Sequence, residues 1–134
     1  MLRRIQLVTD ESAETLDAMQ GEWVVARYRV DDDFVAPFDE GRGAVLEVAG
    51  DRISGTMGIN RIMGSIGEAG IAGPLASTLM AGPQHLMDQE FRLHQLLDSA
   101  DRVVVGESGM TWLHEGLTVI EMKRQGTDPS VPSS

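Results

Sequence analysis

The sequence predicts an α+β fold, consisting of a mostly antiparallel, barrel-like β-sheet with one long helix packed across it. Short runs of β-branched and aromatic residues are separated by turn signals about every eight to twelve residues, which is typical of antiparallel sandwiches and barrels. One segment, residues 83–100, instead repeats its apolar residues with helical spacing. At 134 residues, the chain has the length of a single domain.

The chain divides into an arm, a domain and a tail. Residues 1–20 are expected to form an N-terminal arm or a short helix, since Asp10 can cap a helix that Gly21 ends. Residues 21–124 contain the predicted strands and the long helix, and we take them as the domain. Residues 125–134 lack packing side chains and are predicted to be a flexible tail.

The first predicted strand covers residues 22–30, which are rich in β-branched and aromatic side chains. Alternate residues of a strand point to opposite faces. The more apolar face, which we expect to meet the core, consists of Val24, Ala26, Tyr28 and Val30. Three aspartates follow at 31–33 and resemble part of a calcium loop. They lack the glycine and the distant glutamate that such a loop requires, so a solvated turn is the better interpretation.

The centre of the chain is a glycine-rich stretch, residues 53–65. Strands are predicted at 43–49 and 52–57, joined by a tight turn, and a further strand runs from Met63 to Ile66 after a turn at 58–60. Glycine is expected where the backbone needs positive φ or close approach to another segment. The three glycines concerned are Gly55, Gly58 and Gly64. Their spacing does not fit a phosphate-binding loop. Residues 71–73 are expected to pair briefly before the next proline.

The long helix is predicted from Pro83 to Ala100, because proline suits the first helical position and no glycine or proline follows until Gly106. At about 100° per residue, its apolar face is wide. The face is made of Leu86, Leu93, Leu96, Leu97 and Ala100, with Met87 and Phe91 on its flank. Three closing strands are predicted at 102–106, 110–114 and 117–123.

Two polar side chains, Glu90 and His94, interrupt this apolar face. They are four residues apart and therefore neighbours along the helix. A half-buried carboxylate beside an imidazole is suited to acid–base chemistry. The alternative is that Glu90 accepts hydrogen bonds from backbone amides of a neighbouring glycine-rich segment such as 55–64. We favour this structural role, because no nucleophile or third polar residue is placed by the sequence to complete a site.

Composition excludes several classes of function. The formal net charge is −10, from 11 basic and 21 acidic residues, so nucleic-acid binding is not expected. Without cysteine, disulfides and thiolate chemistry are excluded. Neither a signal peptide nor a membrane span is recognisable, so a cytoplasmic protein is expected. No metal or other cofactor is expected from His85, His94 and His114, which are spread over a helix and a strand.

Several features of the chain, in order, match one known family. They are Trp23 opening the first strand, the segment Ser54-Gly55-x-x-Gly58-x-Asn60-x-x-x-Gly64-Ser65, the segment Leu75-Ala76-Ser77-Thr78-x-Met80-Ala81, and the helix that carries Met87, Glu90, Phe91 and Leu97. Over about residues 21–124 the chain resembles the META domain family, which includes the bacterial heat-shock protein HslJ and many small secreted lipoproteins.

The resemblance implies a barrel-like antiparallel sheet with one helix across it, and it implies stress, virulence or envelope functions more than any enzymatic reaction. Many relatives are envelope proteins. Two departures stand out, because the family usually has cysteines where this chain has Ile59 and Gly82. A redox or disulfide role is therefore excluded for this chain.

Three functions are compatible with the sequence. We favour a non-enzymatic binding or interaction module, related to stress or the envelope, whose partner is an unknown protein or a small apolar ligand. The first alternative is a carrier in which methionines line a cavity, namely Met57, Met63, Met80, Met87 and Met110. The second is a hydrolase or isomerase that uses Glu90 and His94. Edge strands of an incompletely closed barrel also allow a homodimer.

Overall fold

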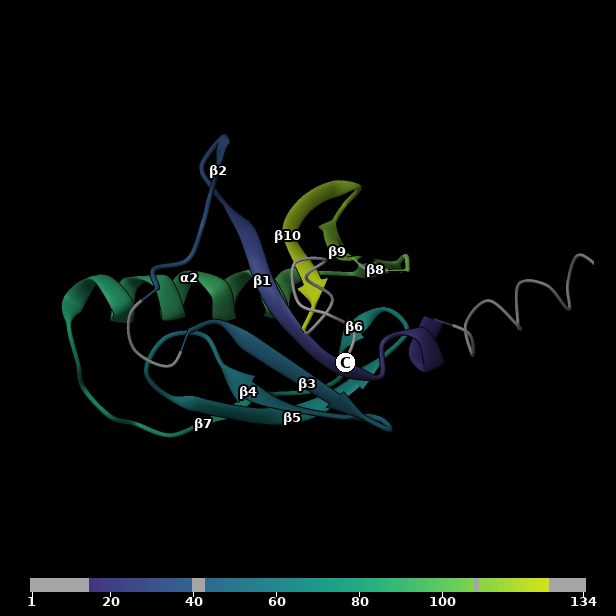
Figure 1. Cartoon of the computed structure of the whole chain (residues 1–134), viewed down its shortest axis with the longest axis horizontal. Coiled ribbons are helices and arrows are strands. Elements are labelled where there is room, and N and C mark those ends of the chain that lie inside the picture. The colour runs from purple at the N-terminus through teal and green to yellow at the C-terminus, as the bar shows by residue number, and fades with distance from the viewer. Residues whose placement is uncertain (1–14, 40–42, 108, 126–134) are drawn as a thin grey trace, which may run out of the picture.

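The computed structural model describes residues 15–39, 43–107 and 109–125 of the chain (Figure 1). Within these residues it contains a helical turn at 15–18, ten strands and one long helix. The strands are β1 (Gly21–Val30), β2 (Asp33–Val35), β3 (Val45–Ala49), β4 (Arg52–Thr56), β5 (Arg61–Gly67), β6 (Gly70–Ile71), β7 (Ala76–Ser77), β8 (Arg102–Val105), β9 (Gly109–His114) and β10 (Leu117–Arg124), and the helix is α2 (Gln84–Ser99).

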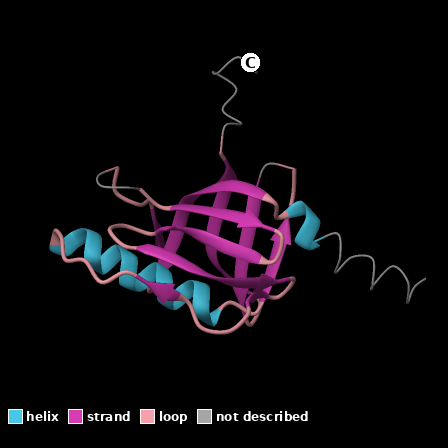
Figure 2. Ribbon diagram, turned by 90° about the horizontal axis from the view of Figure 1, so that it is seen from below, coloured by secondary structure: helices cyan, strands magenta, loops and turns pink. Residues whose placement is uncertain are grey.

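The strands form an antiparallel sheet in the order β6-β5-β4-β3-β1-β10-β9-β8, with β2 paired to β1 and β7 paired to β5. The sheet curls into a barrel that is nearly closed (Figure 2). Helix α2 connects β7, beside one end of this order, to β8 at the other end, and it contacts β6 and β10. The predicted α+β class, with a barrel-like sheet and one helix across it, is confirmed.

Strand β1 differs from the prediction in the face that it buries. Trp23, Val25 and Tyr28 are 0%, 4% and 5% exposed, whereas Val24 and Ala26 are only half-buried. The pairing of β1 with β10 shifts register between Val25 and Arg27, which marks a β-bulge. A bulge inserts one extra residue, so the inward face moves from odd to even positions along the strand. The expectation that Val24 and Ala26 lie on the core face was therefore wrong, whereas Tyr28 and Val30, which follow the bulge, do pack against the core as expected.

Two short strands were not expected. The aspartates at 31–33 do include a turn, in which Asp31 has φ 56°, but Asp33 already begins β2. The guanidinium groups of Arg27 and Arg29 lie over the ring of Phe34 in β2, at 4.7 and 4.5 Å from the ring centroid. The second unexpected strand is β7, which pairs with β5, whereas the expected brief pairing at 71–73 is present as β6.

The core lies between the curled sheet and α2. Its largest fully buried side chains come from nearly every part of the domain and are Trp23, Trp112, Met19, Leu46, Met57, Ile62, Leu93, Leu97, Met110, Ile120 and Met122. The helix buries four of the five predicted face residues, Leu86, Leu93, Leu96 and Leu97, while Ala100 follows its last residue and is half-buried. Pro83 caps the helix instead of occupying its first turn.

The division into arm, domain and tail stays a prediction. Residues 15–20 pack on the domain, since Met19 is 0% exposed and its carbonyl accepts a hydrogen bond from Trp23 Nε1 at 2.8 Å. The rest of the predicted arm, residues 1–14, and the predicted tail from residue 126 onward lie outside the described residues.

Candidate functional site

The site forms where the turn between β4 and β5 meets helix α2. Gly58 makes this approach possible, because a Cβ atom at this position would lie 2.8 Å from the carbonyl oxygen of Leu86 and 3.2 Å from Cβ of Glu90. Real Cβ atoms do not come this close to backbone oxygens, so any side chain at 58 would push the turn away from the helix. The glycine therefore acts here through close approach, one of the two roles that the sequence suggested.

Glu90 binds this turn. Its Oε1 atom accepts hydrogen bonds from the backbone N–H groups of Ile59 at 2.8 Å and Asn60 at 2.6 Å, and its Oε2 atom accepts one from Asn60 Nδ2 at 2.8 Å. Burial alone would raise the pKa of Glu90, but the hydrogen bonds from Asn60 and Ile59 and the nearby His94 outweigh it, so the pKa is lowered. Glu90 is therefore a carboxylate that already has donors on both oxygens.

Asn60 extends the network to the segment that follows β7. Its Oδ1 atom accepts the N–H of Met80 at 2.6 Å, and its Nδ2 atom donates to the carbonyl of Met80 at 3.1 Å. The Thr78 hydroxyl donates to the same Oδ1 at 2.8 Å and accepts from the N–H of Arg61 at 3.0 Å. Three segments that are distant in sequence, the β4–β5 turn, residues 78–80 and helix α2, are thus joined through one buried amide.

Gln89 belongs to the same region and was missed by sequence reasoning. It is 2% exposed, donates from Nε2 to the carbonyl of Met57 at 3.0 Å, and accepts the N–H of Phe38 on Oε1 at 2.8 Å. A signal was present, because at about 100° per residue Gln89 falls between Leu93 and Leu96 on the helical wheel. A polar residue inside the apolar arc marks a side chain that binds backbone groups across the interface.

Beside this network lies a hollow of about 500 Å³, between the segment that follows β7 and helix α2. Figure 2 shows this segment running alongside the helix. The apolar side chains around it are Leu79, Met80, Met87 and Phe91, with exposures of 97%, 46%, 36% and 65%. We call these four side chains the apolar rim. So much exposed apolar surface in one place is typical of a contact surface.

His94 stands in the wall of the hollow. Its Nε2 atom is buried and has no hydrogen-bond partner among the described residues. Burial lowers the pKa of His94, while the carboxylate of Glu90 partly opposes this effect. The imidazole is therefore mostly neutral at pH 7 and adds a polar atom to a largely apolar wall.

The structure thus brings together five of the residues that the sequence singled out, namely Asn60, Ser77, Thr78, Glu90 and His94. The other four residues do not line the hollow and instead have structural roles. Trp23 is in the core with the guanidinium of Arg124 at 4.2 Å from its ring. Gly55 lies against the carbonyl oxygen of Val45, and Gly64 lies against Leu75. Gly58, described above, sets the approach of the turn to α2.

The two positions at which this chain departs from the resembled pattern are adjacent in space. A Cβ atom on Gly82 would lie 2.5 Å from Cδ1 of Ile59. The isoleucine side chain therefore fills the space in front of Gly82, and the two residues form an apolar contact at the edge of the site.

The methionines do not line a common cavity. Met57 and Met110 are 0% and 1% exposed and pack in the core, whereas Met63, Met80 and Met87 are on the surface. Only Met80 and Met87 reach the hollow.

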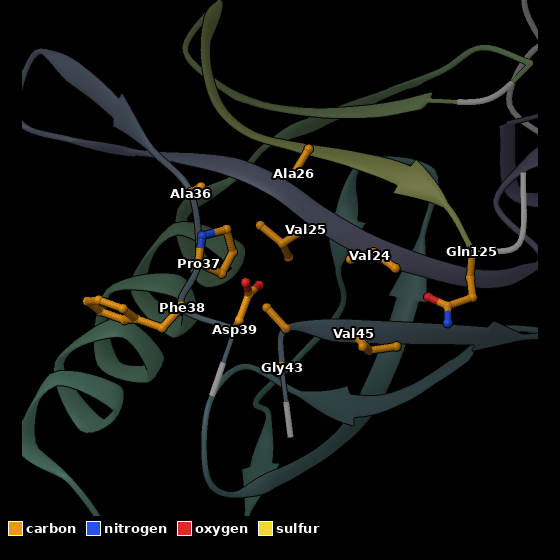
Figure 3. A pocket seen from close by; sticks show the side chains of 11 residues that line it. Val24, Val25, Ala26, Ala36, Pro37, Phe38, Asp39, Gly43, Val45 and Gln125 are labelled. Atoms are coloured by element: carbon orange, nitrogen blue, oxygen red, sulfur yellow. The ribbon is translucent and has the colours of Figure 1, made fainter. Parts of the chain in front are cut away.

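A second hollow, of about 420 Å³, opens where β1 and β3 diverge (Figure 3). Its wall combines Val25, Pro37 and Phe38 with the carboxylate of Asp39, which points into it (Figure 3). It shares no lining residue with the first hollow.

Two further features bear on function. Within the described part of the chain, no group of three or more histidine or acidic side chains is arranged to hold a metal ion. Nor is any helix of that part both long and apolar enough to cross a membrane.

Comparison with known proteins identifies a similar fold and the family of the chain. The structure is similar to an NMR structure of a protein from Burkholderia xenovorans, with a TM-score of 0.69 and 22% identity over 85% of this chain and 88% of the other. No curated protein matches the sequence. The sequence model of the META domain matches residues 14–126, which is most of the chain. The chain therefore belongs to the META domain family.

Proposed function

We propose that this META domain is a non-enzymatic binding module whose contact surface is the hollow with its apolar rim. The observation that carries the proposal is the contrast between the two sides of the site. On the inner side, the polar groups of Asn60, Thr78 and Glu90 are engaged in hydrogen bonds to one another and to the backbone. On the outer side, apolar side chains as large as Leu79 and Phe91 stand in solvent.

The state of Glu90 supports binding over acid–base chemistry. A general base works best with a pKa near the operating pH, whereas the pKa of Glu90 is lowered by the hydrogen bonds it accepts. Protonation would weaken the three hydrogen bonds that its two oxygens accept. We place the binding role within the stress and envelope functions to which the family resemblance points.

The neutral apolar dye Nile red provides a test. We expect saturable binding to the wild type, and affinity about tenfold weaker in Leu79→Ser and in Phe91→Ser, as expected from the loss of one buried apolar contact. Leu117→Ser is the matched control, because Leu117 is 52% exposed in β10 and does not line the hollow. Equal dye affinity in all four proteins would overturn the proposal. Thermal midpoints show whether each variant is folded.

A further inference from the structure

We propose that the segment following β7 accepts an extended, basic and apolar peptide as an added β-strand. This inference rests on the proposed binding function and names the class of ligand. It is carried by the direction of the backbone groups of this segment, by the apolar rim beside it and by the charge of the protein.

One side of the segment is already paired. Ala76 and Ser77 lie opposite Met63 and Ile62 in the ladder between β7 and β5. The N–H of Thr78 then donates to the carbonyl of Arg61 at 3.0 Å, so this residue also directs its amide toward β5.

Beyond Thr78, the side chain of Asn60 takes over the role of the neighbouring strand. It accepts the N–H of Met80 and donates to the carbonyl of the same residue, the two bonds that a backbone neighbour makes in a hydrogen-bonded antiparallel pair. The pairing of the segment on this side therefore continues past the end of β7.

The other side of the segment is open. In an extended chain, successive residues direct their backbone N–H and C=O groups to opposite sides. The backbone groups of Thr78 and Met80 are directed toward β5. Those of Ser77 and Leu79 are therefore directed away from it. Among the described strands, β7 pairs with β5 alone, and residues 76–84 are all exposed. This is an unpaired strand edge, which is a template for an incoming strand.

The surroundings favour a polypeptide with apolar side chains. A strand added along this edge would direct alternate side chains toward the hollow, where Met87 and Phe91 of α2 are exposed. Methionine side chains adapt to different partners, which suits a surface that recognises a class of peptide. A free lipid would fill the hollow but would leave the N–H and C=O groups of the edge unused.

The net charge of the protein indicates which kind of peptide would bind. The protein has a formal net charge of −10, which attracts a cationic partner and repels an acidic one. A second copy of this chain would bring the same negative charge to the contact. Lysine or arginine at the alternate positions, pointing away from the hollow, would complement this field.

The test uses two synthetic peptides with the sequence acetyl-Val-Lys-Val-Lys-Val-Lys-Val-amide. In the second peptide, alternate backbone nitrogens on one edge are methylated, which removes hydrogen-bond donors and keeps every side chain. We expect the first peptide to bind about tenfold more tightly or better, because the methylated peptide cannot complete the ladder. Binding is followed by NMR, in which the amide of Leu79 is expected to shift and to gain protection from hydrogen exchange.

Two variants of the protein distinguish the contribution of the Leu79 backbone N–H to peptide binding from that of the Leu79 side chain. Leu79→Ala and Leu79→Pro both remove the leucine, but only proline removes the outward N–H. We expect Leu79→Ala to keep the preference for the unmethylated peptide and Leu79→Pro to lose it. Replacing the lysines of the peptide with glutamate is expected to weaken binding, with a difference that shrinks as salt is added.

Each contrary result has a distinct meaning. If both peptides bind equally, or if neither binds while Nile red does, strand addition is wrong and the apolar binding function stands. If Nile red also fails to bind in a saturable way, the proposed function itself is wrong. A concentration-dependent dimer in sedimentation equilibrium that Leu79→Pro abolishes would mean that the edge pairs with a second copy instead.

Discussion

The side-chain amide of Asn60 makes two hydrogen bonds to the backbone of Met80, twenty residues further along the chain, with distances of 2.6 Å to its N–H and 3.1 Å to its carbonyl. The same amide donates to Glu90 on helix α2. A single side chain thereby fixes the position of the segment beside the hollow relative to both the sheet and the helix.

This arrangement predicts that Asn60→Asp strongly destabilises the protein. The aspartate would keep the acceptor for Met80 but place a second acceptor against both Glu90 and the carbonyl of Met80, so we expect a loss on the order of 3 kcal/mol in the free energy of unfolding. Urea denaturation at pH 7 measures it. Gln95→Glu, on the exposed face of α2, is the control and should change stability little. A loss as small as that of the control would contradict the role of Asn60.

The substitution Glu90→Gln tests how much the carboxylate of Glu90 contributes to the stability of the protein. Glutamine offers one acceptor oxygen to the amides of Ile59 and Asn60, but its NH₂ group faces the NH₂ group of Asn60, so we expect a loss of about 1–3 kcal/mol. The pH dependence follows from the lowered pKa of Glu90. Its stabilisation is complete above the unfolded-state pKa of about 4.3 and is lost as the pH falls through the folded-state pKa.

The measurement is the free energy of unfolding from pH 7 to pH 2 for the wild type and for Glu90→Gln. The difference between the two proteins should shrink at the acid end, within the range below about pH 4.3. A difference that stays constant with pH would show that the charge of Glu90 contributes nothing.

The substitution His94→Gln is expected to change how the stability of the protein depends on pH between 7 and 5. The pKa of His94 is lowered by burial, so below the unfolded-state value of about 6.5 the unfolded state binds a proton that the folded state resists. Stability of the wild type should therefore fall as the pH drops from 7 toward 5, and this fall should be smaller in His94→Gln. Denaturation at pH 7, 6 and 5 tests the expectation, and parallel curves for the two proteins would refute it.

Gly58→Ala should separate the turn from the helix. The added Cβ would lie 2.8 Å from the carbonyl of Leu86, so the turn must shift, and we expect a loss of roughly 1–3 kcal/mol. Gly67→Ala is the matched control, because Gly67 lies at the far end of β5 from this turn and has nothing within 4 Å of its Cβ position. Glu90 would lose its amide donors in the Gly58 variant, so Nile red binding should weaken together with stability.

Much of the fold could be predicted, because it depends on local patterns. The helix was found almost to the residue, and the strands joined by tight turns were found because turn residues and alternation act over short distances. The face of β1 could not be predicted, since the bulge near Ala26 is set by its pairing with β10, nearly a hundred residues away. Strand β7 is too short to have a pattern of its own.

The candidate site was predicted in part. Glu90 and His94 stand out because they interrupt an apolar helical face. Their partner Asn60 was singled out with the glycine turn and through the family resemblance, but no local rule shows that its amide replaces a strand neighbour for Met80. That role depends on how the chain returns after β7, which the sequence pattern alone does not determine.

The position of β1 has a consequence for biosynthesis. In the sheet, β1 lies between β3, which follows soon after it, and β10, which comes almost at the end of the chain. On the ribosome, β3, β4 and β5 emerge early and can pair with one another and with β1. The far edge of β1 then stays uncovered until residues 117–124 have left the exit tunnel. The barrel therefore closes only after β10 has emerged, and the nascent domain exposes a strand edge until then.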